Sequence, residues 1–317
     1  MRQILITTIL LFAFCLPLQA QTEEQDATIG KKMETFHFAT KDNQELYLDH
    51  HIAPVEGKRG CVIYVFGGGF SGGSRDRDRN YFEFLNRNGW DVVAIDYRLG
   101  MKDASSPGIL EFFKLFEHTI TMAVEDLYSA TDFVVRHAEE WNIDKNLIVI
   151  SGSSAGAITS LQAEYNINRK DQTTRLLPEG FRYAGVIAFA GAVFTLSGAP
   201  DWEERPAPMM LFHGNADTQV PYNKMALFGI GMYGSKYITD RLEQRGWPYW
   251  FYTIEYEDHS MASSPMRDNH TEIMQFLNDF VVQKKDRSVT TFVRNREIEK
   301  RKTWFLPTDF INSNYSD

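Results

Sequence analysis

The sequence contains little cysteine, which limits how the chain can be stabilised. Only two of its 317 residues are cysteines, Cys15 and Cys61. Cys15 lies in an N-terminal apolar segment that we expect to be removed, so no internal disulfide can form in the remaining chain. Cys61 stands in an apolar run typical of a strand, which favours a core position over a nucleophile. Stability must therefore come from burial of apolar side chains.

The chain also lacks clusters of basic residues along its sequence. It carries 33 Lys and Arg against 42 Asp and Glu, a formal net charge of −9 at pH 7. An acidic chain of this kind argues against nucleic acid or an anionic membrane as a partner. It has neither a paired cysteine motif nor a His-Glu-x-x-His motif, so metal catalysis has little support and we expect no metal and no cofactor.

One long apolar run is present, and it stands at the N-terminus. Arg2 precedes an apolar core at residues 4–16, and Leu18-Gln19-Ala20 provides a cleavage site of the small-residue kind. This arrangement predicts a signal peptide over residues 1–20, cleaved after Ala20, and a secreted or periplasmic protein. The core is too short for a comfortable membrane span, so we expect no stable membrane insertion after cleavage. The oligomeric state does not follow from the sequence.

Residues 21–317 predict a single domain of the α/β class. Alternating patterns at residues 35–39 and 45–49 predict an antiparallel hairpin. After the hairpin, apolar runs typical of buried strands alternate with helical patterns along the chain. This alternation predicts a mostly parallel, doubly wound sheet. Candidate strands are residues 61–66, 92–96, 147–150, 185–189, 209–212 and 250–256. The clearest helix places Ala123, Leu127, Ala130, Val134 and Trp141 on one face.

Three segments stand outside this alternation. Residues 101–119 and 192–208 each follow the C-terminal end of a strand, where open α/β sheets bind ligands. They are candidate rims or lids of a site, or else ordinary long connections. The C-terminal extension, residues 285–317, begins with charged residues and has no role that we can assign.

The most informative motif is Gly152-Ser153-Ser154-Ala155-Gly156. It lies between the apolar run 146–150 and a helix-compatible run, 157–165. A serine on such a strand-to-helix turn is pushed out above the sheet, and glycines at both ends avoid clashes. Alone the motif is weak, because it occurs by chance in about one chain of this length in ten. A base, an acid and oxyanion donors must accompany it.

The sequence offers a candidate for each of these parts. Phe66-Gly67-Gly68-Gly69-Phe70 closes the first parallel strand, and its glycines can turn their amides toward a reacting carbonyl. A phosphate-binding loop is not expected there, because the glycines are not followed by a Gly-Lys-Ser/Thr ending. Asp217 follows the strand 209–212, and His259 follows the last strong strand. Of the other histidines, His213 ends the strand that precedes Asp217 and is expected to brace its loop.

The order Ser154, Asp217, His259 resembles that of the α/β-hydrolase superfamily, in its esterase/lipase group of acetyl esterases, carboxylesterases and feruloyl-esterase-like enzymes. The matching pieces are the glycine loop, Asp96-Tyr97-Arg98-Leu99, the serine motif, His213-Gly214 with Asp217 and Pro221, and His259. The resemblance implies Ser154 as nucleophile, His259 as base, Asp217 as acid, and Gly68, Gly69 and Ala155 as oxyanion donors. The family loop usually begins with His where this chain has Phe66, a change expected to keep the backbone donors and alter the loop's rigidity or the acyl pocket.

These observations predict a secreted serine esterase that forms an acyl-enzyme. The expected substrate is a small-molecule or oligosaccharide ester, with a short acyl group or a carbohydrate alcohol. Two alternatives stay open: an amide hydrolase of the arylformamidase or peptidase kind, and an inactive binding protein with a hydrolase fold. Acyl and alcohol specificity do not follow from the sequence.

Overall fold

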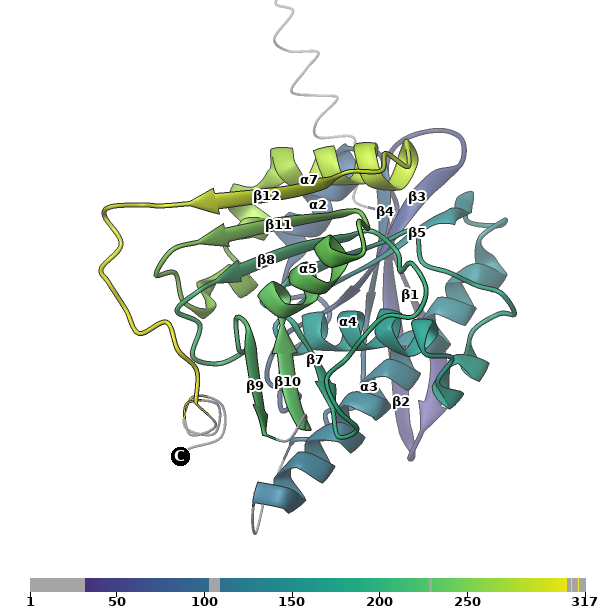
Figure 1. Ribbon diagram of the computed structural model, residues 1–317. Coiled ribbons are helices and arrows are strands. Elements are labelled where there is room, and N and C mark those ends of the chain that lie inside the picture. The colour runs from purple at the N-terminus through teal and green to yellow at the C-terminus, as the bar shows by residue number, and fades with distance from the viewer. Residues whose placement is uncertain (1–31, 103–108, 228–229, 307–308, 310–312, 314–317) are drawn as a thin grey trace, which may run out of the picture. The chain divides into compact units, whose positions relative to one another are not determined.

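The computed structural model describes residues 32–102, 109–227, 230–306, 309 and 313 (Figure 1). The chain from Met33 onward gathers into one compact unit. The predicted signal peptide, residues 1–20, lies outside the described residues and stays a prediction. None of the described helices combines the length and the apolar character that crossing a bilayer requires.

A nine-stranded sheet forms the centre of the described chain, in the order β1-β2-β4-β3-β5-β6-β8-β11-β12. The first two strands form an antiparallel hairpin, β2 pairs antiparallel with β4, and all pairs from β4 to β12 are parallel. The predicted mostly parallel sheet with an N-terminal hairpin is thereby confirmed. The strands are β1 (Met33–Lys41), β2 (Gln44–His51), β3 (Arg59–Val65), β4 (Trp90–Ile95), β5 (Ile143–Ser153), β6 (Gly185–Phe189), β8 (Met209–Gly214), β11 (Tyr249–Ile254) and β12 (Ser288–Val293).

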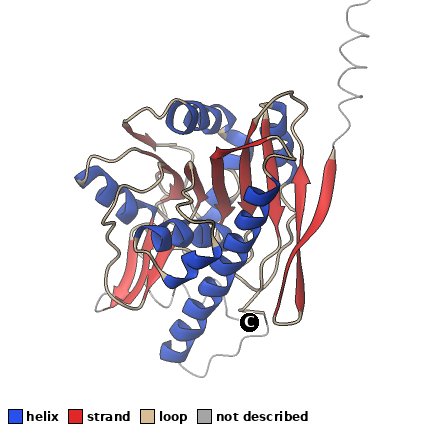
Figure 2. Cartoon of the chain, turned by 90° about the vertical axis from the view of Figure 1, so that its right-hand side faces the viewer, coloured by secondary structure: helices blue, strands red, loops and turns tan. Residues whose placement is uncertain are grey.

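Helices cover both faces of this sheet, which is why its inner strands are apolar throughout (Figure 2). In Figure 1, α3, α4 and α5 lie in front of the sheet, and α2 and α7 lie behind it. The helices are α2 (Arg79–Arg87), α3 (Ile109–His137), α4 (Ala155–Asn168), α5 (Ser235–Gln244), α6 (Pro265–Asp268) and α7 (His270–Phe276), with shorter turns η1 (Gln172–Leu176), η2 (His259–Ala262) and η3 (Leu277–Val282).

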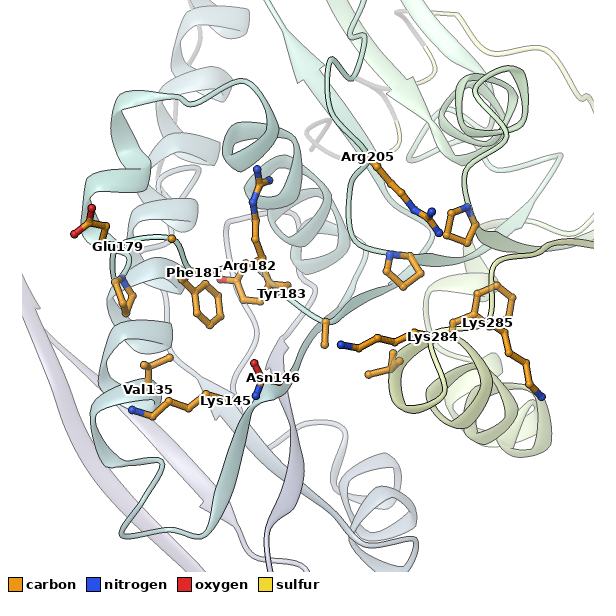
Figure 3. A pocket seen from close by; sticks show the side chains of 17 residues that line it. Val135, Lys145, Asn146, Glu179, Phe181, Arg182, Tyr183, Arg205, Lys284 and Lys285 are labelled. Carbon is orange, nitrogen blue, oxygen red and sulfur yellow. The ribbon is translucent and has the colours of Figure 1, made fainter.

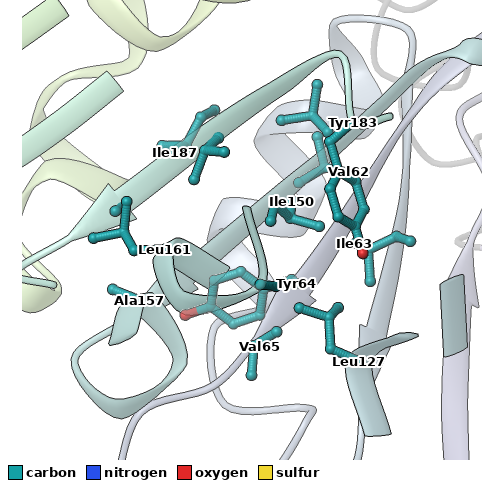
Figure 4. Packing of buried hydrophobic residues seen from close by; sticks show 14 of the residues in the cluster. Val62, Ile63, Tyr64, Val65, Leu127, Ile150, Ala157, Leu161, Tyr183 and Ile187 are labelled. Atoms are coloured by element: carbon teal, nitrogen blue, oxygen red, sulfur yellow. The ribbon is translucent and has the colours of Figure 1, made fainter. Parts of the chain in front are cut away.

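The core lies between the central strands and the helices in front of them. β3, β4, β6 and β8 are buried along their whole length. Figure 4 shows branched side chains of the inner strands, such as Ile150, packed beside Leu127 of α3 and Leu161 of α4. All three side chains are fully buried. Burial of this kind contributes on the order of 1.5–3 kcal/mol per large apolar side chain, and it fixes the strand ends that carry the site.

The predicted helix is longer than its clearest face indicated. Residues 109–119, interpreted as part of a rim or connection, form the first turns of α3, while residues 103–108 lie outside the described part of the chain. The apolar pattern continues upstream through buried Phe112 and Phe116, which explains the extension. At the other end, Trp141 lies beyond the helix, which ends at His137. Its ring packs on Phe36 with centroids 5.0 Å apart.

A second, smaller sheet was not predicted. Within the segment 192–208, β7 (Ala192–Thr195) pairs antiparallel with β10 (Ile230–Gly234), which also pairs with β9 (Lys224–Leu227). The first four residues of that candidate rim are therefore a strand rather than a loop. Likewise, the C-terminal extension supplies β12, which runs parallel to β11 over six residue pairs and forms an edge of the main sheet.

Candidate active site

Ser154 lies on a tight turn that joins β5 to α4. Its backbone has φ 51° and ψ −115°, a conformation that costs a non-glycine residue on the order of 1–3 kcal/mol. Its N–H donates to the carbonyl of Phe189 in β6 at 2.8 Å, which helps to hold the turn. A Cβ added to Gly152 would lie 2.2 Å from the carbonyl oxygen of Gly156, and one on Gly156 would lie 2.0 Å from that of Val65. Both flanking positions therefore require glycine.

His259 lies between the serine and the candidate acid. Its Nε2 is 2.8 Å from Ser154 Oγ, and its Nδ1 is 2.7 Å from Asp217 Oδ2. The three residues are far apart in sequence, but each follows a parallel strand, namely β5, β8 and β11. The carboxyl ends of these strands meet at one edge of the sheet, so the structure brings the three predicted side chains into one hydrogen-bonded chain.

The Asp217 carboxylate is fully buried and accepts several hydrogen bonds. Its Oδ1 accepts hydrogen bonds from the backbone N–H groups of Gln219 and Val220, at 2.8 and 2.9 Å. Burial alone would raise the pKa of Asp217, but the charge and hydrogen bonds of His259 and His213 outweigh it and hold that pKa well below its usual value. An ionised Asp217 favours N–H at Nδ1 of His259. Nε2 is then free of hydrogen and can accept the proton of Ser154.

His213 stands behind the acid, at the position expected to brace its loop. Its Nε2 is 3.3 Å from Asp217 Oδ2, and its Nδ1 is 2.8 Å from the hydroxyl of Ser235. Both side chains are fully buried. Ser235 was not anticipated, because it is the first residue of α5, and only the packing of that helix on β8 brings its hydroxyl to the imidazole. No local sequence signal could have identified it.

The glycine loop after β3 lies directly beside the serine turn. A Cβ added to Gly67 would lie 3.2 Å from the Cβ of Ser154, so the two backbones approach closely. Gly68 and Gly69 adopt φ of 136° and 62°, conformations that side chains disfavour. The carbonyl of Gly68 accepts hydrogen bonds from residues 71 and 72, which fixes the loop as a turn. Ala155, the third candidate donor, is the first residue of α4.

Phe66 begins this loop and fixes it by packing. Its ring lies 4.4 Å from that of Tyr97, centroid to centroid, and is almost fully buried. The Tyr97 hydroxyl donates to the carbonyl oxygen of Phe66 at 3.0 Å. A Cβ on Gly73 would lie 2.6 Å from the same ring. The Phe66 side chain thus holds the loop in place through van der Waals contacts with Tyr97 and Gly73.

In the described part of the chain, neither the cysteine nor any group of metal-ligating side chains forms a second catalytic site. Cys61 is completely buried in β3, and this burial raises the pKa of its thiol well above the usual value. Within the same residues, no three His, Cys, Asp or Glu side chains gather closely enough to hold a metal ion.

Comparisons with known proteins bear on the family and the fold of the chain. The family model described as BD-FAE matches residues 46–193, which include the glycine loop and Ser154 but stop before Asp217 and His259. Searching the curated proteins gave no match. Among solved structures, the chain resembles the apo form of Thermogutta terrifontis esterase 2, at 22% identity and a TM-score of 0.58, covering 79% of this chain and 94% of that one.

Two further structures of that esterase give similar values. Its propionate-bound form matches at 22% identity and a TM-score of 0.58, over 79% of this chain and 94% of that one. The form phosphorylated by paraoxon matches at 22% identity and a TM-score of 0.58, over 80% and 94%. At this identity the likeness is one of fold: the sheet and its helices are shared.

Proposed function

We propose that this chain, whose fold is that of the α/β-hydrolases, is a serine hydrolase that cleaves carboxylic esters. The observation that carries the proposal is the hydrogen-bonded chain from buried Asp217 through His259 to Ser154. A serine hydroxyl is a poor nucleophile near neutral pH unless a base takes its proton, and His259 Nε2 is within reach of that proton. The family match and the esterase structures support the same reaction class.

The proposed reaction has two halves. Ser154 Oγ attacks the ester carbonyl while its proton passes to His259 Nε2, and the charge on the imidazolium is stabilised by Asp217. The tetrahedral oxyanion accepts hydrogen bonds from backbone amides of Gly68, Gly69 and Ala155, and one such donor is typically worth about 10²–10³ in kcat. His259 then protonates the leaving alcohol. Water attacks the acyl-enzyme by the same steps in reverse and releases the acid.

For substrate and location, we propose a secreted or periplasmic enzyme acting on short-chain acyl esters or carbohydrate-linked esters. The predicted signal peptide supports the location. The propionate- and butyrate-bound structures of the similar Thermogutta esterase support a short acyl group. Amide cleavage and a purely binding role remain the alternatives, and the complete hydrogen-bonded chain argues against the second.

Labelling with a fluorophosphonate probe tests the nucleophile. We expect wild type to label and Ser154→Ala to be inert, because the probe reacts only with an activated serine. Ser153→Ala is the matched control: its hydroxyl donates to the carbonyl of Ala262 rather than to His259, so labelling should persist. Equal labelling of wild type and Ser154→Ala would show that Ser154 is not the nucleophile and would contradict the proposal.

Substrate and location need their own measurements. Turnover of p-nitrophenyl acetate, butyrate, octanoate and a feruloyl ester reports the acyl pocket. A matched ester and amide pair separates esterase from amidase, and faster cleavage of the amide would favour the latter. N-terminal sequencing of protein recovered outside the cytoplasm should begin at Gln21, and an intact Met1 there would contradict the predicted cleavage.

A further inference from the structure

A cavity of about 700 Å³ opens at the sheet edge opposite Ser154 (Figure 3). Its walls include Asn146 near the start of β5, and Pro208 and Pro248 directly before β8 and β11. These are the strands whose other ends lead to the serine, the acid and the base. The eight residues from Asn146 to Ser154, at about 3.3 Å each, separate the cavity from the nucleophile by roughly 25 Å. It is therefore distinct from the proposed active site.

The side chains that line this cavity are mostly cationic where they are charged. The cations are Lys145, Arg182, Arg205, Lys284 and Lys285, and the one acid is Glu179. The whole chain, by contrast, has a net charge of −9. These residues come from separate segments, so the concentration of positive charge exists only in the fold. Where these cations are not paired with acids, an anion entering here meets a favourable potential on an otherwise acidic protein.

Some of these cations are already neutralised by acids outside the lining. The pairs are Arg182–Glu204, Arg205–Asp286 and Lys285–Asp279, each at 2.8 Å. Lys145 and Lys284 differ, because neither has an ion-pair partner among the residues that the structure describes. Lys284 also has a φ of 53°, an uncommon backbone conformation for a non-glycine residue. In Figure 3 its amine points from the η3 side into the cavity.

The floor of the cavity is apolar and aromatic. Tyr183, Phe280 and Val281 are almost fully buried there. Phe181 is half-buried, and its ring stands edge-on to that of Tyr183 with centroids 5.0 Å apart. A volume of 700 Å³ lies inside the roughly 300–1,000 Å³ of small-molecule sites, which combine an apolar lining with a few polar anchors. Phe181 keeps part of its ring exposed, and a ring skeleton would cover this apolar surface whereas a free inorganic ion would not.

We propose that this cavity binds an acidic oligosaccharide, one whose sugar rings carry carboxylates. The carboxylates would meet the amines of Lys145 and Lys284, and the carbon faces of the rings would lie on the floor around Phe181. The inference goes beyond ester hydrolysis, because it concerns a second site on the opposite edge of the sheet and does not depend on Ser154.

The test is calorimetric binding of trigalacturonate to the full chain carrying Ser154→Ala, which prevents turnover. We expect binding at low ionic strength that is at least tenfold tighter than that of neutral maltotriose, and that weakens as salt is added. Lys145→Glu with Lys284→Glu should lower the affinity at least tenfold. Lys114→Glu with Lys300→Glu makes the same change in net charge at exposed positions outside the cavity lining and should lower it less than twofold.

All substituted lysines are exposed, and thermal melting of each variant verifies that it has folded. Absence of trigalacturonate binding would overturn the proposal, and so would equal losses in the two double variants. Inorganic phosphate is the third probe. If phosphate binds as tightly as trigalacturonate, the site recognises a bare oxyanion and the assignment to a sugar acid is wrong.

Discussion

Replacing Glu164 by Gln should remove about 3 kcal/mol of pH dependence from the stability of the fold. Glu164 lies in α4 and is only 1% exposed. Its Oε1 accepts a hydrogen bond from the N–H of Ala207 at 2.9 Å, while its Oε2 has no partner among the described residues. Burial raises the pKa of this carboxyl from 4.5 to about 7, because the hydrogen bond from Ala207 and the charge of Arg182 offset only part of the lost hydration.

The sign follows from proton binding. Between pH 4.5 and 7 the folded chain keeps a proton on Glu164 that the unfolded chain has released. The stability associated with this proton is therefore fully present below about pH 4.5 and is lost as the pH rises to 7. At 1.36 kcal/mol per pKa unit, a shift of about 2.5 units corresponds to about 3 kcal/mol in the free energy of unfolding.

Urea denaturation at pH 4.5 and pH 8 measures this effect. Wild type should lose about 3 kcal/mol more between the two pH values than Glu164→Gln does, because all other titrating groups are common to both. Glu243→Gln, at an exposed position of α5, controls for the loss of one carboxylate. If wild type and Glu164→Gln change equally with pH, the assignment of a buried, protonated Glu164 is refuted.

Three further changes test the site and the fold. Asp217→Asn should lower kcat about 10⁴-fold, because a neutral amide no longer selects the proton position on His259; ester turnover within tenfold of wild type would contradict the role of the acid. Gly156→Ala places a Cβ 2.0 Å from the carbonyl oxygen of Val65, and urea denaturation should show a loss of about 1–3 kcal/mol, whereas wild-type stability would mean that the turn can relax. Ending the chain at Arg287 removes β12 and exposes the edge of β11, so light scattering should show concentration-dependent association; a monomer that melts at the wild-type temperature would argue against a protective role.

The sequence predicts the inner sheet well because burial there acts on every residue. β6 has the predicted bounds, 185–189, since both of its faces are covered and its apolar run coincides with the strand. β12 was not predicted, because it lies at a sheet edge where its residues alternate between exposed and half-buried, and it has no continuous apolar run. β9 and β10 are short, and β10 pairs with β7, a segment about 40 residues upstream.

Some parts of the site follow from the predicted strands, whereas others depend on tertiary packing. Ser154, Asp217 and His259 each follow a strand, so strand prediction alone places them at one edge. The contact between His213 and Ser235 depends on how α5 packs, which leaves no local pattern. The cationic cavity is assembled from the starts of several strands and the turn after η3, and for that reason the charge pattern along the chain conceals it.

The position of β12 also orders events during synthesis. β11 can pair with β8 as soon as it leaves the ribosome, but its outer neighbour ends about 40 residues later in the chain. At roughly 5–20 residues per second, the outer edge of β11 stays open for about 2–8 seconds after β11 is made. The nascent chain therefore already contains Ser154, Asp217 and His259 while the edge that β12 will cover is still open to misassociation.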